Sequence, residues 1–340
     1  MMAKNLKRTD EWPSQDILFC IAQDHANSRL WVGSSDFKIY ELDLSKEKPV
    51  RIAFQGEHQS YVTGMVRLGE MLVTSSYDRH LQWWDIVERK LIRSIRAHDG
   101  WIRRVIASAD GSQVISIADD MQCKVWDALS GQAISAFSDH PRLTPHHFPS
   151  MLYAVAASAD GKWIATGDKV GHVALWDAQR CEKVGELETP VMYTWDPKAR
   201  MHSIGGIRSL AFSPDSQRLA VGGTGKIGNI DHLEGPARLE VFDRASCTRE
   251  LELEDKNKKG LIEQIVWSPD QQWIMTAGGD NNGFITIYDA KSGELLHQEG
   301  QNGHIHGLAC DASFAHIYAA AHERVSRWTM VESPPAEATH

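Results

Sequence analysis

Features that would indicate a membrane protein or a secreted protein are missing from this chain of 340 residues. No apolar run approaches the roughly 18 residues that a membrane-spanning helix needs. The N-terminal segment M-M-A-K-N-L-K-R-T-D-E-W-P has no apolar core, so it does not resemble a secretory signal. The five cysteines are scattered without a C-x-x-C pair, which predicts reduced thiols. We therefore expect a cytoplasmic protein.

Sequence motifs of common enzymes are also missing. The chain has no P-loop, no G-x-S-x-G and no H-E-x-x-H. The segment G-G-T-G-K-I-G at 222–228 lacks the P-loop spacing, and we interpret it as a hairpin tip. The net charge of −9 disfavours nonspecific nucleic-acid binding, which needs a basic surface. We expect no enzymatic activity, no cofactor and no membrane or nucleic-acid partner.

One group of histidines deserves comparison with a metal site: His140, His146, His147 and His202. His140 and His202 lie at or near positions that have a structural explanation in the repeats described below. The remaining pair, His146-His147, lies in a proline-rich loop without a fixed ligand spacing. We interpret it as an exposed loop and predict no metal.

What the chain does contain is a repeat. Asp43, Asp85 and Asp127 lie 42 residues apart, and each closes a strand-like segment such as S-Y-D-R-H-L-Q-W-W-D. A period of roughly 40 to 45 residues that ends in Trp-Asp is typical of a propeller with four-stranded blades. The closing positions give seven units: Leu42-Asp43, Trp84-Asp85, Trp126-Asp127, Trp176-Asp177, Phe242-Asp243, Tyr288-Asp289 and Trp328-Thr329.

In this pattern the chain resembles the WD40-repeat family over nearly all of its length. The resemblance implies an all-β fold, a seven-bladed WD40-type β-propeller built as a closed ring of four-stranded antiparallel blades. It implies a single domain over residues 1–330, with blades closing near 43, 85, 127, 177, 243, 289 and 329, followed by a flexible tail at 331–340. It also implies that the N-terminal K-N-L-K-R-T-D segment pairs outside the three strands of unit seven.

The resemblance also gives several polar residues a structural role. In such blades a His, a Ser or Thr, an Asp and the Trp form one hydrogen-bonded chain. Unit three carries this set as His98, Ser116, Asp120 and Trp126, and unit two as His58, Thr74, Asp78 and Trp84. Each set resembles a His–Asp general-base pair, but its repetition favours structure over catalysis. Units one, five, six and seven depart from this pattern, because Leu42, Phe242 and Tyr288 replace Trp and His322 stands where the turn Asp would be. Asp168 and Asp280 precede their closing Asp by nine residues rather than seven, which implies a longer turn. Such blades should depend more on apolar packing.

Three insertions interrupt the regular period. They lie before Met151, before Ile207 and between the second and third strands of unit five. The resemblance implies that all three emerge on the top face, over blades four and five. Insertions in repeat proteins often form the binding face, although neutral drift of loops is the alternative.

Aromatic and basic residues near this face are the predicted binding site. In the family, the position three residues after the opening His faces the top surface, and Tyr61 and Trp101 occupy it here; for Trp101, simple cover of the channel rim is the alternative. The predicted partner-binding residues are Tyr61, Tyr77, Arg79, Trp101, Arg142, Tyr193 and Trp195.

The sequence therefore predicts a non-catalytic protein–protein interaction scaffold that binds a peptide or protein on the top face, as a subunit of a larger complex. Two alternatives stay open. A propeller enzyme would need inward His, Glu or Asp groups around a metal or cofactor in the channel. An RNA-associated subunit would need a basic top face.

Overall fold

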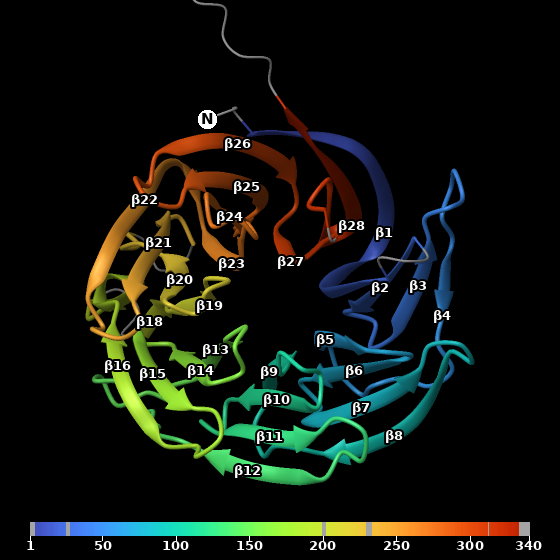
Figure 1. Ribbon diagram of the computed structural model, residues 1–340, viewed down its shortest axis with the longest axis horizontal. Helices are drawn as coiled ribbons and strands as arrows, with labels where there is room; N and C mark the ends of the chain where they lie inside the picture. The colour runs from blue at the N-terminus through green and yellow to red at the C-terminus, as the bar shows by residue number, and fades with distance from the viewer. Residues whose placement is uncertain (1–3, 25–27, 199–201, 229–232, 312, 333–340) are drawn as a thin grey trace, which may run out of the picture.

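The computed structural model describes residues 4–24, 28–198, 202–228, 233–311 and 313–332. Nearly all of its elements are β-strands, and the helix in the described ranges is the short 3-10 helix η1 (Pro190–Met192). The strands form antiparallel sheets arranged in a ring (Figure 1). The predicted all-β propeller is confirmed. No helix in these ranges is long and apolar enough to cross a bilayer.

Five sheets contain four strands each, and strands that follow one another in the chain are neighbours. The first sheet consists of β5 (Val62–Leu68), β6 (Met71–Ser76), β7 (His80–Asp85) and β8 (Lys90–Arg96). The second consists of β9 (Ile102–Ala107), β10 (Gln113–Ala118), β11 (Cys123–Asp127) and β12 (Ala133–Phe137). The third consists of β13 (Leu152–Ala157), β14 (Trp163–Asp168), β15 (His172–Asp177) and β16 (Lys183–Glu188). The fourth consists of β19 (Ile207–Phe212), β20 (Arg218–Thr224), β21 (Pro236–Asp243) and β22 (Arg249–Lys259). The fifth consists of β23 (Leu261–Trp267), β24 (Trp273–Gly279), β25 (Asn282–Asp289) and β26 (Leu295–Asn302). A separate hairpin is formed by β17 (Tyr193–Asp196) and β18 (His202–Gly205).

The sixth large sheet joins the two ends of the chain. Its order is β27-β28-β1-β2-β3-β4. The bounds are β27 (Ile305–Cys310), β28 (His316–Glu332), β1 (Lys4–Asp24), β2 (Arg29–Ser34), β3 (Ile39–Asp43) and β4 (Arg51–Ala53). The prediction of a seven-bladed closed ring of four-stranded blades is therefore wrong in its blade count and its closure: the described residues form six large sheets, and no continuous strand ladder closes the ring. The reason is that β1 pairs first with β28 and then with β2, which merges the strands of the first and last repeats.

The N-terminal strand covers the edge of β28, as the resemblance to the WD40-repeat family implied. Lys4 pairs with Glu332 and Arg8 with Trp328 in an antiparallel register. Leu6 is buried in the same core cluster as Trp328. In the described part of the chain, the strand ladders run within sheets, and one isolated backbone bridge, between Gln55 and Lys90, connects two neighbouring sheets. The predicted tail from 333 onward lies outside the described residues, while residues 331 and 332 belong to β28.

The repeated closing aspartate has a local physical reason. In six repeats it is the last residue of the third strand, as Asp127 is in β11. Its carboxylate then accepts a backbone hydrogen bond from the following turn: the Ser130 N–H lies 2.7 Å from Asp127 Oδ1, and the Ser246 N–H lies 2.7 Å from Asp243 Oδ1. Asp side chains favour such turns because they replace a missing backbone acceptor. The spacing of these residues therefore fixes where each third strand ends.

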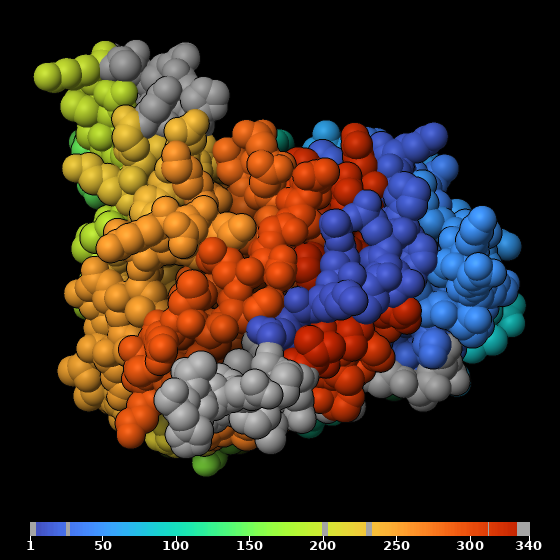
Figure 2. All heavy atoms as spheres, turned by 90° about the horizontal axis from the view of Figure 1, so that it is seen from above, coloured from blue at the N-terminus to red at the C-terminus, as the bar shows by residue number. Residues whose placement is uncertain are grey.

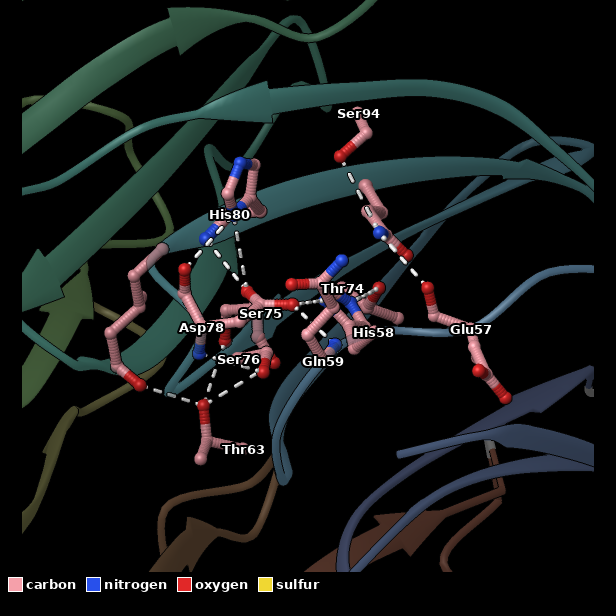
Figure 3. A network of polar contacts seen from close by, with 12 residues as sticks. Glu57, His58, Gln59, Thr63, Thr74, Ser75, Ser76, Asp78, His80 and Ser94 are labelled. Atoms are coloured by element: carbon pink, nitrogen blue, oxygen red, sulfur yellow. Dashed lines mark hydrogen bonds and ion pairs between the residues drawn. The ribbon is translucent and has the colours of Figure 1, made fainter. Parts of the chain in front are cut away.

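The predicted polar chains are present and buried. In unit two, His58 Nδ1 lies 2.9 Å from Asp78 Oδ2, and His58 Nε2 lies 2.8 Å from Thr74 Oγ1 (Figure 3). Trp84 Nε1 donates to the same threonine oxygen over 2.8 Å. Burial would raise the pKa of Asp78, but the hydrogen bonds from His58 and from backbone N–H groups lower it to about 2. Because both ring nitrogens of His58 are bonded inside the sheet, this His–Asp pair has a structural role.

Unit three repeats this geometry, and unit four corrects the sequence prediction. His98 Nε2 lies 2.8 Å from Ser116 Oγ, to which Trp126 Nε1 donates over 2.9 Å. Unit four was expected to depend on apolar packing because of its longer turn. It nevertheless forms the full chain, with His140 Nδ1 3.0 Å from Asp168 Oδ2 and Nε2 2.8 Å from Thr166 Oγ1. The extra residues are accommodated in the turn, so the carboxylate still reaches the histidine.

Candidate functional site

The innermost strand of every repeat contains an irregularity that directs one side chain toward the ring axis. In each pairing between the innermost strand and its neighbour, one residue is skipped, as in a β-bulge. The skipped residues are Phe19 in β1, Thr63 in β5, Arg103 in β9, Tyr153 in β13, Arg208 in β19, Glu263 in β23 and His306 in β27. All of them line one cavity of about 420 Å³, which we call the axial cavity.

The bulges follow from the local sequence. Each skipped residue comes directly after a buried aliphatic residue, such as Ile102 before Arg103 and Ile305 before His306. The aliphatic side chain is buried. The side chain of the next residue, which is the extra residue of the bulge, lines the axial cavity. This arrangement lets polar and aromatic residues of different types occupy equivalent positions around the axis.

A stack of aromatic rings extends from the axial cavity to the surface. The Trp101 ring stacks on the Tyr77 ring, with 4.8 Å between centroids and 17° between planes. Tyr77 lies 6.0 Å from Tyr61, and Tyr61 stacks on Phe19 at 5.4 Å. Trp101 is 52% exposed and Tyr61 is 41% exposed. We call Phe19, Tyr61, Tyr77 and Trp101 the aromatic stack. It confirms that Tyr61, Tyr77 and Trp101 lie together, and Phe19 is a member that sequence reasoning missed.

Arg103 connects the aromatic stack to the other side of the axial cavity. Its guanidinium donates to both carboxylate oxygens of Asp119 over 2.7 Å and to the Tyr77 hydroxyl over 2.8 Å. Burial opposes the charge of Arg103, but the hydrogen bond to Asp119 raises its pKa above the ordinary value. The same guanidinium lies 5.1 Å from the centre of the Tyr153 ring, and Arg208 covers that ring at 3.7 Å. The cationic groups are thus held rigidly by aromatic faces and one carboxylate.

The opposite side of the axial cavity holds Glu263 and three histidines. The ring of His304 lies 4.3 Å from that of His306, and His322 lies 5.0 Å from His306. Arg104 Nη2 donates to the Glu263 backbone carbonyl over 2.8 Å and to Oε2 over 3.3 Å. Burial would raise the pKa of Glu263, but nearby His304 and Arg104 lower it to about 2. Burial and the nearby His304 also lower the pKa of His306 well below its ordinary value.

The three insertions contact one another, but they form a second group of side chains. His146 stacks on Trp195 at 4.1 Å and lies 3.0 Å from the Tyr193 hydroxyl. The backbone N–H of Ile227, from the third insertion, donates to Thr194 Oγ1 over 3.0 Å. Figure 2 shows yellow-green and yellow parts of the chain projecting from one face of the ring. Trp195 therefore packs against another insertion, and both Tyr193 and Trp195 are half-buried.

The remaining predicted positions occupy turns and loops. Arg79 is exposed in the turn after Asp78, with a φ of 74°, and Arg142 is exposed in the insertion before Met151. In the histidine group singled out from the sequence, His140 belongs to a polar chain and His146 to the insertion contacts, while the side chain of His202 lies outside the described residues. The histidines that do gather, His304, His306 and His322, were missed. Only His306 had a signal in the sequence, because it directly follows the opening aliphatic residue Ile305.

Comparisons with known proteins agree with this architecture. A family model described as "WD domain, G-beta repeat" matches residues 89–127, 139–177 and 197–227. The chain is 32% identical over 142 residues to "Nuclear distribution protein PAC1-2" of Uncinocarpus reesii, covering 36% of this chain and 30% of that protein. It is 23% identical over 236 residues to "Eukaryotic translation initiation factor 3 subunit I" of Candida albicans, covering 68% and 59%. It is 24% identical over 259 residues to human "Pre-mRNA-processing factor 17", covering 67% and 42%.

These matches span less than two thirds of the relatives' own length, so they describe the repeats rather than whole proteins. The matched segments at 89–127 and 139–177 end at Asp127 and Asp177, two of the closing positions found in the sequence. The chain therefore contains WD40 repeats, set in a ring of antiparallel sheets, as its regular closing positions indicated.

Proposed function

We propose that this protein is a non-catalytic interaction scaffold that binds a protein or peptide partner across the aromatic stack at the axial cavity. The observation that carries the proposal is the partial exposure of stacked rings, with Trp101 at 52% and Tyr61 at 41%. Exposed aromatic residues of this size are frequent hot spots of protein interfaces.

The stack is also suited to binding because its rings are already ordered. Trp101 lies against Tyr77, and Arg103 holds Tyr77 through its hydroxyl over 2.8 Å. A partner that covers these rings would lose little additional side-chain freedom on binding. Pre-organised contacts of this kind improve affinity because less conformational entropy is lost.

A subunit role is part of the proposal. One relative is named as a subunit of a translation initiation factor and another as a pre-mRNA-processing factor. For this chain we propose a place in a larger complex, with residues 1–330 acting as one domain in the cytoplasm. We further propose that the partner reaches the contacting insertions, so that Tyr193, Trp195, Arg79 and Arg142 lie at the border of the interface.

The test begins with identification of a partner by affinity purification of the tagged chain. Binding of that partner is then titrated against Trp101→Ala, Tyr61→Ala and the control Lys162→Ala. Lys162 is exposed in the turn between β13 and β14. Tyr153 lies near the opposite end of β13, so Lys162 represents the face of the ring away from the aromatic stack. We expect Trp101→Ala to weaken binding by about 2 kcal/mol, as for a hot spot. Wild-type affinity of both aromatic variants, with loss of binding in Lys162→Ala, would refute the proposed surface.

A further inference from the structure

Three possible metal ligands from neighbouring sheets converge in the axial cavity. Glu263 lies in β23, His304 directly precedes β27, and His306 is the second residue of β27. Their ligand atoms all lie within 4.8 Å of one another. Two imidazole nitrogens and one carboxylate are a ligand set that zinc uses in proteins, with the fourth position left for water or another group. His322 also lies nearby, with its ring centre 5.0 Å from that of His306.

The histidines lack partners where a ligand would bind. His304 is only 5% exposed, and in the described residues neither His304 Nε2 nor His306 Nε2 has a hydrogen-bond partner. The distance from His304 Nε2 to Glu263 Oε1 is 3.7 Å, too long for a hydrogen bond. The histidines of the polar chains differ, because both ring nitrogens of His58 and His98 are bonded. Buried polar atoms without partners are costly, which points to a bound group at this position.

The surrounding charges leave one carboxylate oxygen available. Arg104 donates to Glu263 Oε2 over 3.3 Å, while Oε1 faces His304. Arg208, the other nearby cation, stacks on Tyr153 at 3.7 Å. These guanidinium groups repel a cation, so the site should bind more weakly than a closed structural zinc site.

We propose that Glu263, His304 and His306 form a binding site for a divalent transition-metal ion, with zinc as the best match. The ion would connect β23 to β27, two inner strands of different sheets that share no ladder hydrogen bonds in the described chain. Two imidazole nitrogens beside one carboxylate suit zinc and its neighbours in the first transition series, whereas calcium and magnesium prefer sites made of oxygen ligands. The open side of the ion would face the axial cavity.

A second cluster in the described residues provides a useful contrast. The ligand atoms of Asp139, His172 and Glu186 also lie within 4.8 Å of one another. However, the Lys183 ammonium bonds both Asp139 and Glu186, the latter over 2.6 Å. His172 Nδ1 lies 2.6 Å from Glu188 Oε1. This cluster already has a cation and internal partners, and we assign no metal to it.

The test uses the full chain after treatment with a chelator. Zinc binding is measured by calorimetric titration, and the imidazole nitrogens are followed by NMR in the wild-type protein. We expect uptake of a single ion, with shifts of the Nε2 signals of His304 and His306 and unchanged signals for His58 and His98. The double variant His304→Gln/His306→Gln should lose more than about 100-fold in affinity, because even outer-shell changes cost about 10- to 100-fold. His172→Gln is the matched control and should bind as the wild type does.

Three outcomes would overturn the proposal. The first is unchanged zinc affinity in the His304→Gln/His306→Gln variant. The second is loss of binding in His172→Gln, which would move the site to the exposed cluster. The third is an absence of imidazole shifts on zinc addition while inorganic phosphate shifts the same signals, which would show an anion site. Because the NMR measurement uses the wild-type chain, it decides the question even if a variant fails to fold.

Discussion

Replacement of Asp120 by alanine tests the structural role of the polar chains most directly. Asp120 accepts hydrogen bonds from His98 Nδ1 over 3.0 Å and from the backbone N–H groups of Asp99 and Gln122 over 3.0 and 3.1 Å. His98 is buried, so its Nδ1–H would be left without an acceptor, while the two backbone donors lie closer to water. One unsatisfied buried donor costs on the order of 1–3 kcal/mol. We expect a loss of unfolding free energy of this size at pH 7.

The pH dependence gives a second measure of the same interaction. Burial would raise the pKa of Asp120, but the hydrogen bonds from His98 and the backbone lower it from 3.8 to about 2. A carboxylate with a lowered pKa stabilises the fold above its unfolded value and loses this contribution as the pH falls toward its folded value. The difference between wild type and Asp120→Ala should therefore be complete above about pH 4 and shrink between pH 4 and pH 2.

The assay is urea unfolding and calorimetry of both proteins, with Asp110→Ala as the matched control. Asp110 is an exposed aspartate in a turn of the same sheet, and it accepts hydrogen bonds from Ser108 and Ser112. Its loss should destabilise the protein less, because water can replace its partners. If Asp120→Ala is no less stable than Asp110→Ala, the buried polar chain does not stabilise this sheet. Loss of partner binding at full stability would instead give Asp120 a direct role in the interface.

Further predictions concern the chain ends, a tight turn and the surface. Removal of residues 1–10 should lower the thermal midpoint, because it exposes the edge of β28 and the buried Leu6 contact; an unchanged midpoint would refute the closing role of this strand. Gly100→Ala should destabilise the fold by about 1–3 kcal/mol in urea unfolding, because a Cβ there would lie 2.5 Å from the backbone N of Asp120. Trp195→Ala should weaken partner binding in the titration by about 2 kcal/mol, and wild-type affinity would place the insertions outside the interface.

The sequence predicted the features that depend on neighbours along the chain. The repeat placed the blades, and the closing aspartates marked the ends of third strands because the carboxylate accepts a hydrogen bond from the following turn. The polar chain of His98, Ser116, Asp120 and Trp126 was also predicted, since its members belong to one repeat. The chain of unit four was not, because the sequence does not show that a longer turn still returns Asp168 to His140.

Other features required the folded ring. The merging of the first and last repeats into one sheet follows from the path of β1 between β28 and β2, which local patterns do not encode. The inward direction of Phe19, Glu263 and His306 arises from bulges, and their effect appears only where seven inner strands meet at one axis. Glu263 lies in β23 and His304 directly precedes β27, so the packing of two different sheets brings these side chains together. The sequence by itself determined the repeat and its internal bonds, and only the tertiary structure decided which side chains share the axial cavity.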